Sequence, residues 1–146
     1  MGFGGGKTHS LISLYHTVKY SRDFRNMEAA RQILDPEDMP QFDDARVAVF
    51  TQNTVSVVDG HQAEDGIITH TLWGELAYQL GGREGYERVR RADEQRIAPT
   101  AKDIKPIIEG ATPALILIDE LADYCAKASG LTVGGGTLFT QTNSFM

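Results

Sequence analysis

Apolar residues recur at intervals of three and four in several parts of the chain, and this spacing predicts amphipathic helices. In residues 7–19 the spacing places four side chains on one helical face: Leu11, Leu14, Tyr15 and Val18. Residues 24–34 follow the same spacing, with four side chains directed toward a core: Phe24, Met27, Ala30 and Leu34. Asp35-Pro36 ends this second helix, because proline cannot continue one.

The middle of the chain predicts two further helices separated by glycines. The first covers residues 72–80, with Thr71 as its N-terminal cap and Gly81-Gly82 as its stop. One face of it is apolar and is expected in the core: Trp73, Leu76, Ala77 and Leu80. The second covers residues 85–96. It is charged and has two apolar anchors, so we expect it on the surface.

The last third of the chain predicts three more helices, around residues 104–108, over 121–129 and from 138 onward. Pro106 leaves the start of the first one open, because proline disturbs a helix interior. Gly130 is placed to end the second, and the third follows a glycine triplet, residues 134–136, that is expected to be a flexible loop.

Two short apolar runs predict strands. Residues 45–50 are rich in Val and Phe, and residues 114–118 are apolar without interruption, which is typical of a strand buried on both faces. Residues 51–66 carry two Asp-Gly pairs and are expected to run over the surface. The order of helices and strands predicts an α/β fold with a parallel sheet, although two strands are few for such a sheet.

Glycine is concentrated at the start of the chain, immediately before a predicted helix. Gly4, Gly5 and Gly6 precede Lys7 and Thr8, which gives the closing part of the phosphate-binding pattern G-x-x-x-x-G-K-[ST]. Its glycines let backbone N–H groups converge on an anion, and the following helix adds its positive end. In such a loop the lysine reaches the β- and γ-phosphates and the threonine hydroxyl ligates Mg²⁺. The alternative is a flexible leader before a helix.

Two carboxylates directly follow the predicted strand 114–118. Ligands of open α/β sheets bind at the carboxyl ends of the strands, so Asp119 is expected at the ligand edge. In P-loop enzymes an aspartate at this place holds Mg²⁺, and a neighbouring glutamate, here Glu120, orients the attacking water. The alternative is that one of the two carboxylates only caps the helix that begins at Leu121.

The remaining polar candidates carry weaker signals. The four histidines, His9, His16, His61 and His70, have no metal-ligand spacing and no cysteine partners, so a zinc site is not expected. His9 lies beside the glycine loop and is a candidate contact to a nucleotide, with an exposed first-turn position as the alternative. The cluster Arg88, Arg90 and Arg91 is expected on a solvated face, and Cys125 in or near the core.

Composition narrows the class of protein. With 14 Lys and Arg against 20 Asp and Glu, the net charge of −6 argues against binding nucleic acid by bulk charge. The longest apolar run is far too short to span a bilayer, and the N-terminus lacks a secretory signal, so no membrane partner is expected. A single cysteine excludes an internal disulfide, and a reducing cytoplasm is the simplest compartment.

Three segments together resemble a family of large prokaryotic AAA-type ATP-binding proteins, catalogued mainly as a domain of unknown function. They are residues 4–16, residues 71–81 with Leu-Trp-Gly-Glu, and residues 115–120. The resemblance implies an additional-strand P-loop fold of three layers, αβα, in which residues 45–50 form the second strand and the Asp-Glu strand is the third. It implies that Gly4, Gly5, Gly6, Lys7 and Thr8 form the phosphate loop, Asp119 the magnesium residue and Glu120 the catalytic base.

Compared with that family, we expect residues 1–146 to form a partial P-loop ATPase domain without the strand before the loop and without the later strands. We therefore expect an ATP- and Mg²⁺-binding module of an AAA-like ATPase that hydrolyses ATP weakly or not at all by itself. The expected partners are a second copy or other domains of a larger ATPase, and DNA only indirectly, through the restriction or phage-defence context of some relatives. The alternatives are a P-loop kinase acting on a small molecule or nucleotide, and a non-catalytic regulatory or interaction fragment.

Overall fold

The computed structural model describes residues 6–32, 35, 37–38, 41–42 and 44–146. The described helices are α1 (Lys7–Lys19), α2 (Ser21–Asn26), α3 (Glu28–Arg31), α4 (Leu72–Glu94), α5 (Ala101–Gly110), α6 (Leu121–Ser129) and α7 (Leu138–Phe145). The described strands are β1 (Arg46–Phe50), β2 (His61–Gln62), β3 (Ile68–Thr69), β4 (Ala114–Ile118), β5 (Thr132–Val133) and β6 (Gly136–Thr137).

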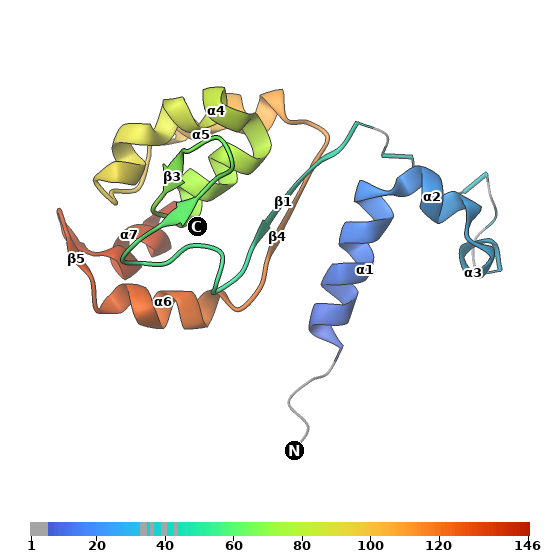
Figure 1. The fold of residues 1–146 in the computed structure, drawn as a ribbon, viewed down its shortest axis with the longest axis horizontal. Coiled ribbons are helices and arrows are strands. Elements are labelled where there is room, and N and C mark those ends of the chain that lie inside the picture. Colours follow the sequence, from blue (N-terminus) through green and yellow to red (C-terminus); the bar gives the residue numbers. More distant parts are fainter. Residues whose placement is uncertain (1–5, 33–34, 36, 39–40, 43) are drawn as a thin grey trace, which may run out of the picture.

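A parallel pair of strands, β1 and β4, stands at the centre of the fold. Their register runs from Arg46 opposite Ala114 to Phe50 opposite Ile118. Helix α1 lies on one side of this pair, and α4, α5, α6 and α7 lie on the other (Figure 1). The predicted α/β class with a small parallel sheet is confirmed.

The two faces of β1 have different neighbours. Ala48 and Phe50 are fully buried and face the main core, where the Phe50 ring meets Tyr124 of α6 edge to face at 5.0 Å between ring centroids. Val49 points the other way, toward α1, together with Leu117 of β4. This alternation follows from the pleat of a strand, which sends successive side chains to opposite faces. The core therefore lies between the sheet and α4 to α7.

Several helix predictions are confirmed residue by residue. Helix α1 covers residues 7–19, α6 covers 121–129 with Gly130 as its C-cap, and α7 begins at residue 138. Thr71 caps α4 as predicted, because its hydroxyl accepts a hydrogen bond from the Gly74 N–H at 3.1 Å. The apolar face of α4 is buried as predicted: Trp73, Leu76, Ala77 and Leu80.

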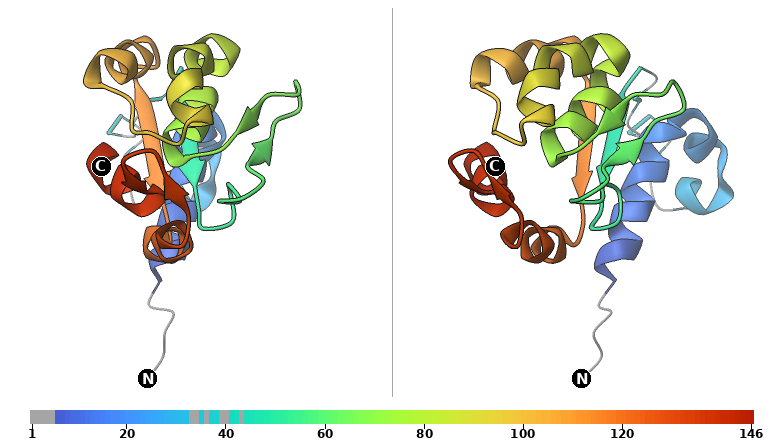
Figure 2. Two further views of the ribbon diagram at one scale, coloured as in Figure 1. Left: turned by 90° about the vertical axis from the view of Figure 1, so that its left-hand side faces the viewer. Right: turned by 60° about the vertical axis from the view of Figure 1, so that its left-hand side comes forward.

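The predicted helix break at Gly81-Gly82 is confirmed. Gly82 has a φ of 60° and a ψ of −153°, a non-helical conformation that suits glycine, so α4 consists of two helical segments that meet at a kink there. The second segment lies at the surface with its charged face, as predicted, since Arg88 and Arg91 are exposed and the anchors Tyr86 and Val89 are buried. The burial of Asp93 in this segment was not predicted. This half of α4 is covered by α5 and by the segment that carries β3 (Figure 2).

The single helix predicted over residues 24–34 is wrong as well. An extended residue, Met27 (φ −71°, ψ 130°), separates α2 from α3. Its side chain is 54% exposed, whereas the helical spacing had placed it in a core. Of the other expected core residues, Ala30 is buried, and Leu34 lies outside the described residues.

Two predicted loops contain short hairpins. Strands β2 and β3 pair antiparallel within residues 51–70, where Val55 and Ile67 are buried, so this segment is more than a run over the surface. Strands β5 and β6 pair antiparallel around the glycine triplet. Strands of two residues are too short to give a hydrophobic period, which is why the sequence pattern missed them.

Strand β4 is less buried than predicted. Ala114 and Ile116 are exposed, Ile116 by 37%. Among the described strands β4 pairs only with β1, so its other edge has no strand beside it. Pro106 lies inside α5, which settles the open start of that helix at Ala101.

Candidate functional site

Helix α1 begins at the carboxyl end of β4, and this places two predicted ligand residues in contact. The hydroxyl of Thr8 donates a hydrogen bond of 3.2 Å to Oδ2 of Asp119, across 111 residues of sequence. Thr8 is exposed and Asp119 is half-buried. A hydroxyl and a carboxylate therefore converge at the edge where open α/β sheets bind ligands.

The residue before α1 has a backbone conformation that favours glycine. Gly6 has a φ of 72°, in the left-handed region that favours glycine, and it is the N-cap of α1. Its carbonyl accepts hydrogen bonds from the N–H and the hydroxyl of Ser10. Lys7 follows as the first residue of the helix and is exposed. Gly4 and Gly5, the other predicted loop residues, lie outside the described residues.

The end of β4 fixes Asp119 firmly. Its N–H donates to the carbonyl of Phe50 at 2.9 Å, which extends the β1–β4 ladder by one bond. Its Oδ1 accepts from the N–H of Glu120 at 3.0 Å, while Oδ2 accepts from Thr8. The backbone then turns at Glu120, a non-glycine residue with a φ of 53°. Left-handed residues of this kind are uncommon and cluster at functional sites.

The Glu120 side chain does not cap the helix that follows it. Glu120 is the N-cap of α6 by position, yet its side chain makes no capping hydrogen bond within the described residues. Instead its Oε2 accepts from Nε2 of Gln52 at 2.7 Å. The capping alternative therefore does not account for this carboxylate, which faces the segment after β1.

A cavity of about 370 Å³ opens beside the Thr8–Asp119 contact. Its walls are mostly apolar and come from α1 and both central strands: Leu11, Ile12, Tyr15, Val49 and Leu117. Thr8 and Asp119 supply polar groups to this lining. His9, the other predicted nucleotide contact, is exposed on the first turn of α1 and is not in the lining.

Sequence reasoning missed Gln52. The signal was present, because residues 51–54 (Thr-Gln-Asn-Thr) form a polar run directly after a predicted strand. The argument that placed Asp119 at the carboxyl edge applies equally to the end of β1. In a parallel pair both ends meet at one edge, so Gln52 and Glu120 become neighbours.

Other polar candidates lie away from this site. His61 and His70 each bring Nδ1 to a buried carboxylate, that of Glu75 at 2.9 Å and that of Asp93 at 3.1 Å. Burial raises the pKa of the Cys125 thiol, which disfavours the reactive thiolate. In the part of the chain that the structure describes, no three His, Cys, Asp or Glu side chains form a metal cluster, and no helix is both long and apolar enough to cross a membrane.

A family model matches most of the chain. No curated protein and no solved structure matches the chain. The family model of the DUF499 N-terminal domain, a domain of unknown function, matches residues 1–132. That span includes both strands of the parallel pair and each of the residues that meet at its carboxyl edge: Gly6, Lys7, Thr8, Gln52, Asp119 and Glu120. The chain therefore belongs to the DUF499 family.

Proposed function

We propose that this edge of the sheet binds ATP with Mg²⁺ and hydrolyses it, as the nucleotide site of an AAA-like P-loop ATPase. The observation that carries the proposal is the contact between Thr8 Oγ1 and Asp119 Oδ2 at 3.2 Å. The glycine-lysine-threonine pattern and the aspartate after a strand were identified separately in the sequence, 111 residues apart. Their contact in the fold is what a shared phosphate and metal site requires.

The residues before and in the first turn of α1 would bind the phosphates. Gly6 leaves room for an anion, since no heavy atom of the described residues lies within 4 Å of the place a Cβ would take. The N–H groups of the first turn of α1 are capped by no side chain of the part of the chain that the structure describes, and Lys7 adds a positive charge beside them. An exposed lysine at this place is free to reach the β- and γ-phosphates of a bound nucleotide.

Thr8 and Asp119 fit the metal. Both offer oxygen atoms, which Mg²⁺ prefers, and two protein ligands suffice because the remaining positions are taken by phosphate oxygens and water. Bound there, the ion would supply positive charge against the phosphates. Asp119 is well suited to hold its place, since the strand ladder and the Glu120 N–H both fix it.

Glu120 supplies the base. Its carboxylate orients a water molecule and takes the proton as the water oxygen forms a bond to the γ-phosphorus. The bond between that phosphorus and the bridging oxygen breaks, which releases ADP and inorganic phosphate. Gln52 contacts the same carboxylate at 2.7 Å and so influences its direction. In the family that the chain resembles, hydrolysis would drive movement of attached domains or of a second copy. The use of ATP as substrate favours a cytoplasmic location.

Calorimetric titration with Mg²⁺–ATP tests the proposal. We expect the wild-type chain to bind, and Thr8→Val and Lys7→Ala to weaken binding at least about tenfold, because each removes a charge-assisted or metal-directed contact. Thr17→Val is the matched control: Thr17 lies on the same helix, where its hydroxyl donates to the Ser13 carbonyl at 2.8 Å. Absence of binding to the folded wild-type chain, or unchanged binding by Thr8→Val, would contradict the proposal. Release of inorganic phosphate from ATP alone separates hydrolysis from transfer to an acceptor.

A further inference from the structure

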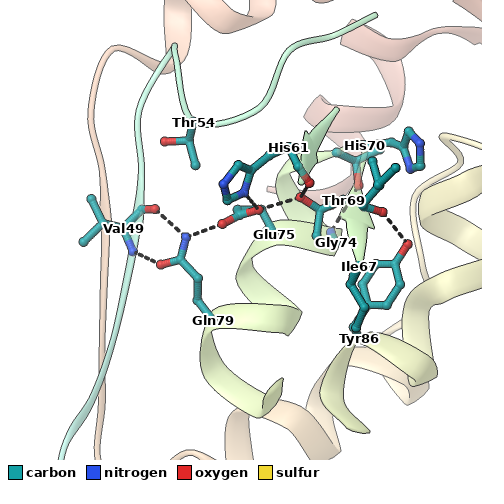
Figure 3. A network of polar contacts seen from close by, with 12 residues as sticks. Val49, Thr54, His61, Ile67, Thr69, His70, Gly74, Glu75, Gln79 and Tyr86 are labelled. Carbon is teal, nitrogen blue, oxygen red and sulfur yellow. Dashed lines mark hydrogen bonds and ion pairs between the residues drawn. The ribbon is translucent and has the colours of Figure 1, made fainter. Parts of the chain in front are cut away.

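Two polar side chains of α4, Glu75 and Gln79, stand on a helix face that is otherwise in the core. Both belong to the segment of residues 71–81 that carries Leu-Trp-Gly-Glu, and neither has a place in the proposed reaction. Figure 3 shows Gln79 between the backbone of β1 and the Glu75 carboxylate. Their contacts lead from the β2–β3 hairpin to the strand that ends beside Glu120.

The Gln79 amide pairs with both backbone polar groups of one residue of β1. Its Oε1 accepts from the Val49 N–H at 2.7 Å, and its Nε2 donates to the Val49 carbonyl at 2.9 Å. In a parallel ladder alternate residues bond to the same neighbour, and Arg46 and Phe50 are bonded to the β4 side. The N–H and carbonyl of Val49 therefore point to the opposite edge of β1. The Gln79 amide pairs with them there, in the place of a further strand.

Glu75 fixes the direction of that amide. The second hydrogen on Gln79 Nε2 donates to Glu75 Oε1 at 2.6 Å. Turning the amide over would set its oxygen against the Glu75 carboxylate and the Val49 carbonyl, three acceptors with no hydrogen between them. Glu75 is in turn held by the hairpin, because its Oε2 accepts from the Thr69 hydroxyl at 2.5 Å and contacts His61 Nδ1 at 2.9 Å. Only 1% of Glu75 is exposed, so these bonds are not exchanged for water.

Val49, the residue that Gln79 holds, stands three positions before Gln52. Three residues of a strand span roughly 10 Å. Between them, Phe50 is packed against Tyr124. This ring contact holds the strand toward the core, whereas the Gln79 bonds resist sliding of β1 along α4. Both are needed to define where the end of β1, and with it the Gln52 side chain, meets Glu120.

We propose that Gln79 is a positioning residue for Glu120, acting through Val49 and the end of β1 on Gln52, which holds the Glu120 carboxylate. The catalytic role of Glu120 rests on the proposed function, but the positioning does not. In this arrangement the Glu75 carboxylate and the β2–β3 hairpin keep Gln79 in its bonding direction. The hairpin thereby becomes part of the support of the site.

Nuclear magnetic resonance of the ¹⁵N-labelled chain tests the proposal without nucleotide. Loss of signals in Gln52→Ala assigns the Gln52 side-chain amide, and Glu120→Ala gives its position when the carboxylate is absent. Gln79→Met preserves the side-chain length and removes its hydrogen bonds. We expect the Gln52 signals in Gln79→Met to move toward their position in Glu120→Ala. Exchange of the Val49 amide proton should accelerate about tenfold, as local opening becomes easier.

Gln141→Met is the matched control. It makes the same substitution at a glutamine of α7, whose Oε1 accepts from the Ala98 N–H at 2.9 Å, a partner outside both β1 and the β2–β3 hairpin. It should leave the Gln52 signals at their wild-type position. Gln79→Glu, which retains an acceptor for the Val49 N–H, is the second variant. Wild-type Gln52 signals in a folded Gln79 variant, equal movement in Gln141→Met, or failure of both Gln79 variants to fold would overturn the proposal.

Nucleotide binding separates this proposal from the previous one. Gln79 contacts β1 and not the phosphate loop, so Gln79→Met should bind Mg²⁺–ATP within about twofold of wild type, as expected for separate sites. If the wild-type chain binds no Mg²⁺–ATP, the proposed function fails while the Gln52 signals still decide the positioning. If the chain hydrolyses ATP, Gln79→Met should lower kcat and leave KM unchanged.

Discussion

The chain carries two pairs of carboxylates in contrasting surroundings. Glu75 and Asp93 lie inside the fold on α4, 1% and 0% exposed, whereas Asp119 and Glu120 stand at the carboxyl edge of the sheet, half-buried and exposed. The inner pair meets more donors than the outer pair. Asp93, for example, accepts from three donors: the His70 N–H, the Thr71 hydroxyl and the Tyr86 hydroxyl.

The number of donors reflects what burial requires. A carboxylate removed from water loses its hydration and must recover it from protein donors, so Glu75 and Asp93 tie together elements that are distant in sequence. Burial and then the neighbouring Asp93 carboxylate raise the pKa of Tyr86, so its hydroxyl keeps the proton it donates. The outer pair remains accessible to a ligand. The inner carboxylates thus serve the fold, and the outer ones are available for chemistry.

The largest expected difference in stability comes from replacing one carboxylate of each pair by alanine. Glu75→Ala removes the acceptor of the buried Thr69 hydroxyl and of the Gln79 amide and leaves a cavity, so we expect the free energy of unfolding to fall by about 3–4 kcal/mol. Glu120→Ala removes an exposed side chain and should change it by no more than about 0.5 kcal/mol. Urea unfolding followed by circular dichroism measures both. Similar losses in the two variants would erase the distinction between the pairs.

Gly74, in the Leu-Trp-Gly-Glu segment, offers a test of how firmly the inner carboxylate Asp93 is held. A Cβ at Gly74 would overlap the Asp93 carboxylate, which its donors hold in place. Gly74→Ala should therefore cost about 2–3 kcal/mol of stability through overpacking and displaced hydrogen bonds. Thermal or urea unfolding gives the value.

Gly110→Ala provides the control for that substitution. Gly110 is the last residue of α5, and nothing lies within 4 Å of the place its Cβ would take. Alanine is the better helix former, so this variant should be neutral or more stable by up to about 1 kcal/mol. A Gly74→Ala chain as stable as Gly110→Ala would mean that Asp93 is not held where the contacts place it.

The outer pair was the part of the molecule that sequence could predict. Asp119 and Glu120 directly follow a predicted strand, and their neighbour Thr8 belongs to a pattern at the start of a predicted helix, so all three could be located without the fold. The bounds of α1 and α6 were predictable for the same reason, since glycines mark one end of each. The pairing of Thr8 with Asp119 still needed the structure, because no local pattern shows that two segments 111 residues apart meet.

The inner pair was not predictable in this way. Glu75 lies i, i+4 from Gln79 on an apolar helix face, which is a signal of buried polar groups, but its other partners, Thr69 and His61, come from a hairpin with two-residue strands. The burial of Asp93 was equally hidden. Asp93 lies in a charged segment, and no local pattern shows that two of its donors come from before the first turn of α4.

The smallest expected effect concerns an exposed carboxylate that serves the fold alone. Asp103 accepts from the Thr100 hydroxyl at 2.7 Å and from the Thr100 N–H at 3.0 Å, at the start of α5. The hydroxyl bond first, and then the backbone bond, lower the pKa of Asp103 below its ordinary value. A carboxyl whose pKa is lowered by folding stabilises the fold at neutral pH, and this contribution is lost as the pH falls. Asp103→Asn should therefore cost about 0.5 kcal/mol near neutral pH, and the difference from wild type should shrink below about pH 4. Urea unfolding of both chains across this range measures it. A difference independent of pH would show that the Asp103 charge contributes nothing to stability, and that the cap acts through its hydrogen bonds alone.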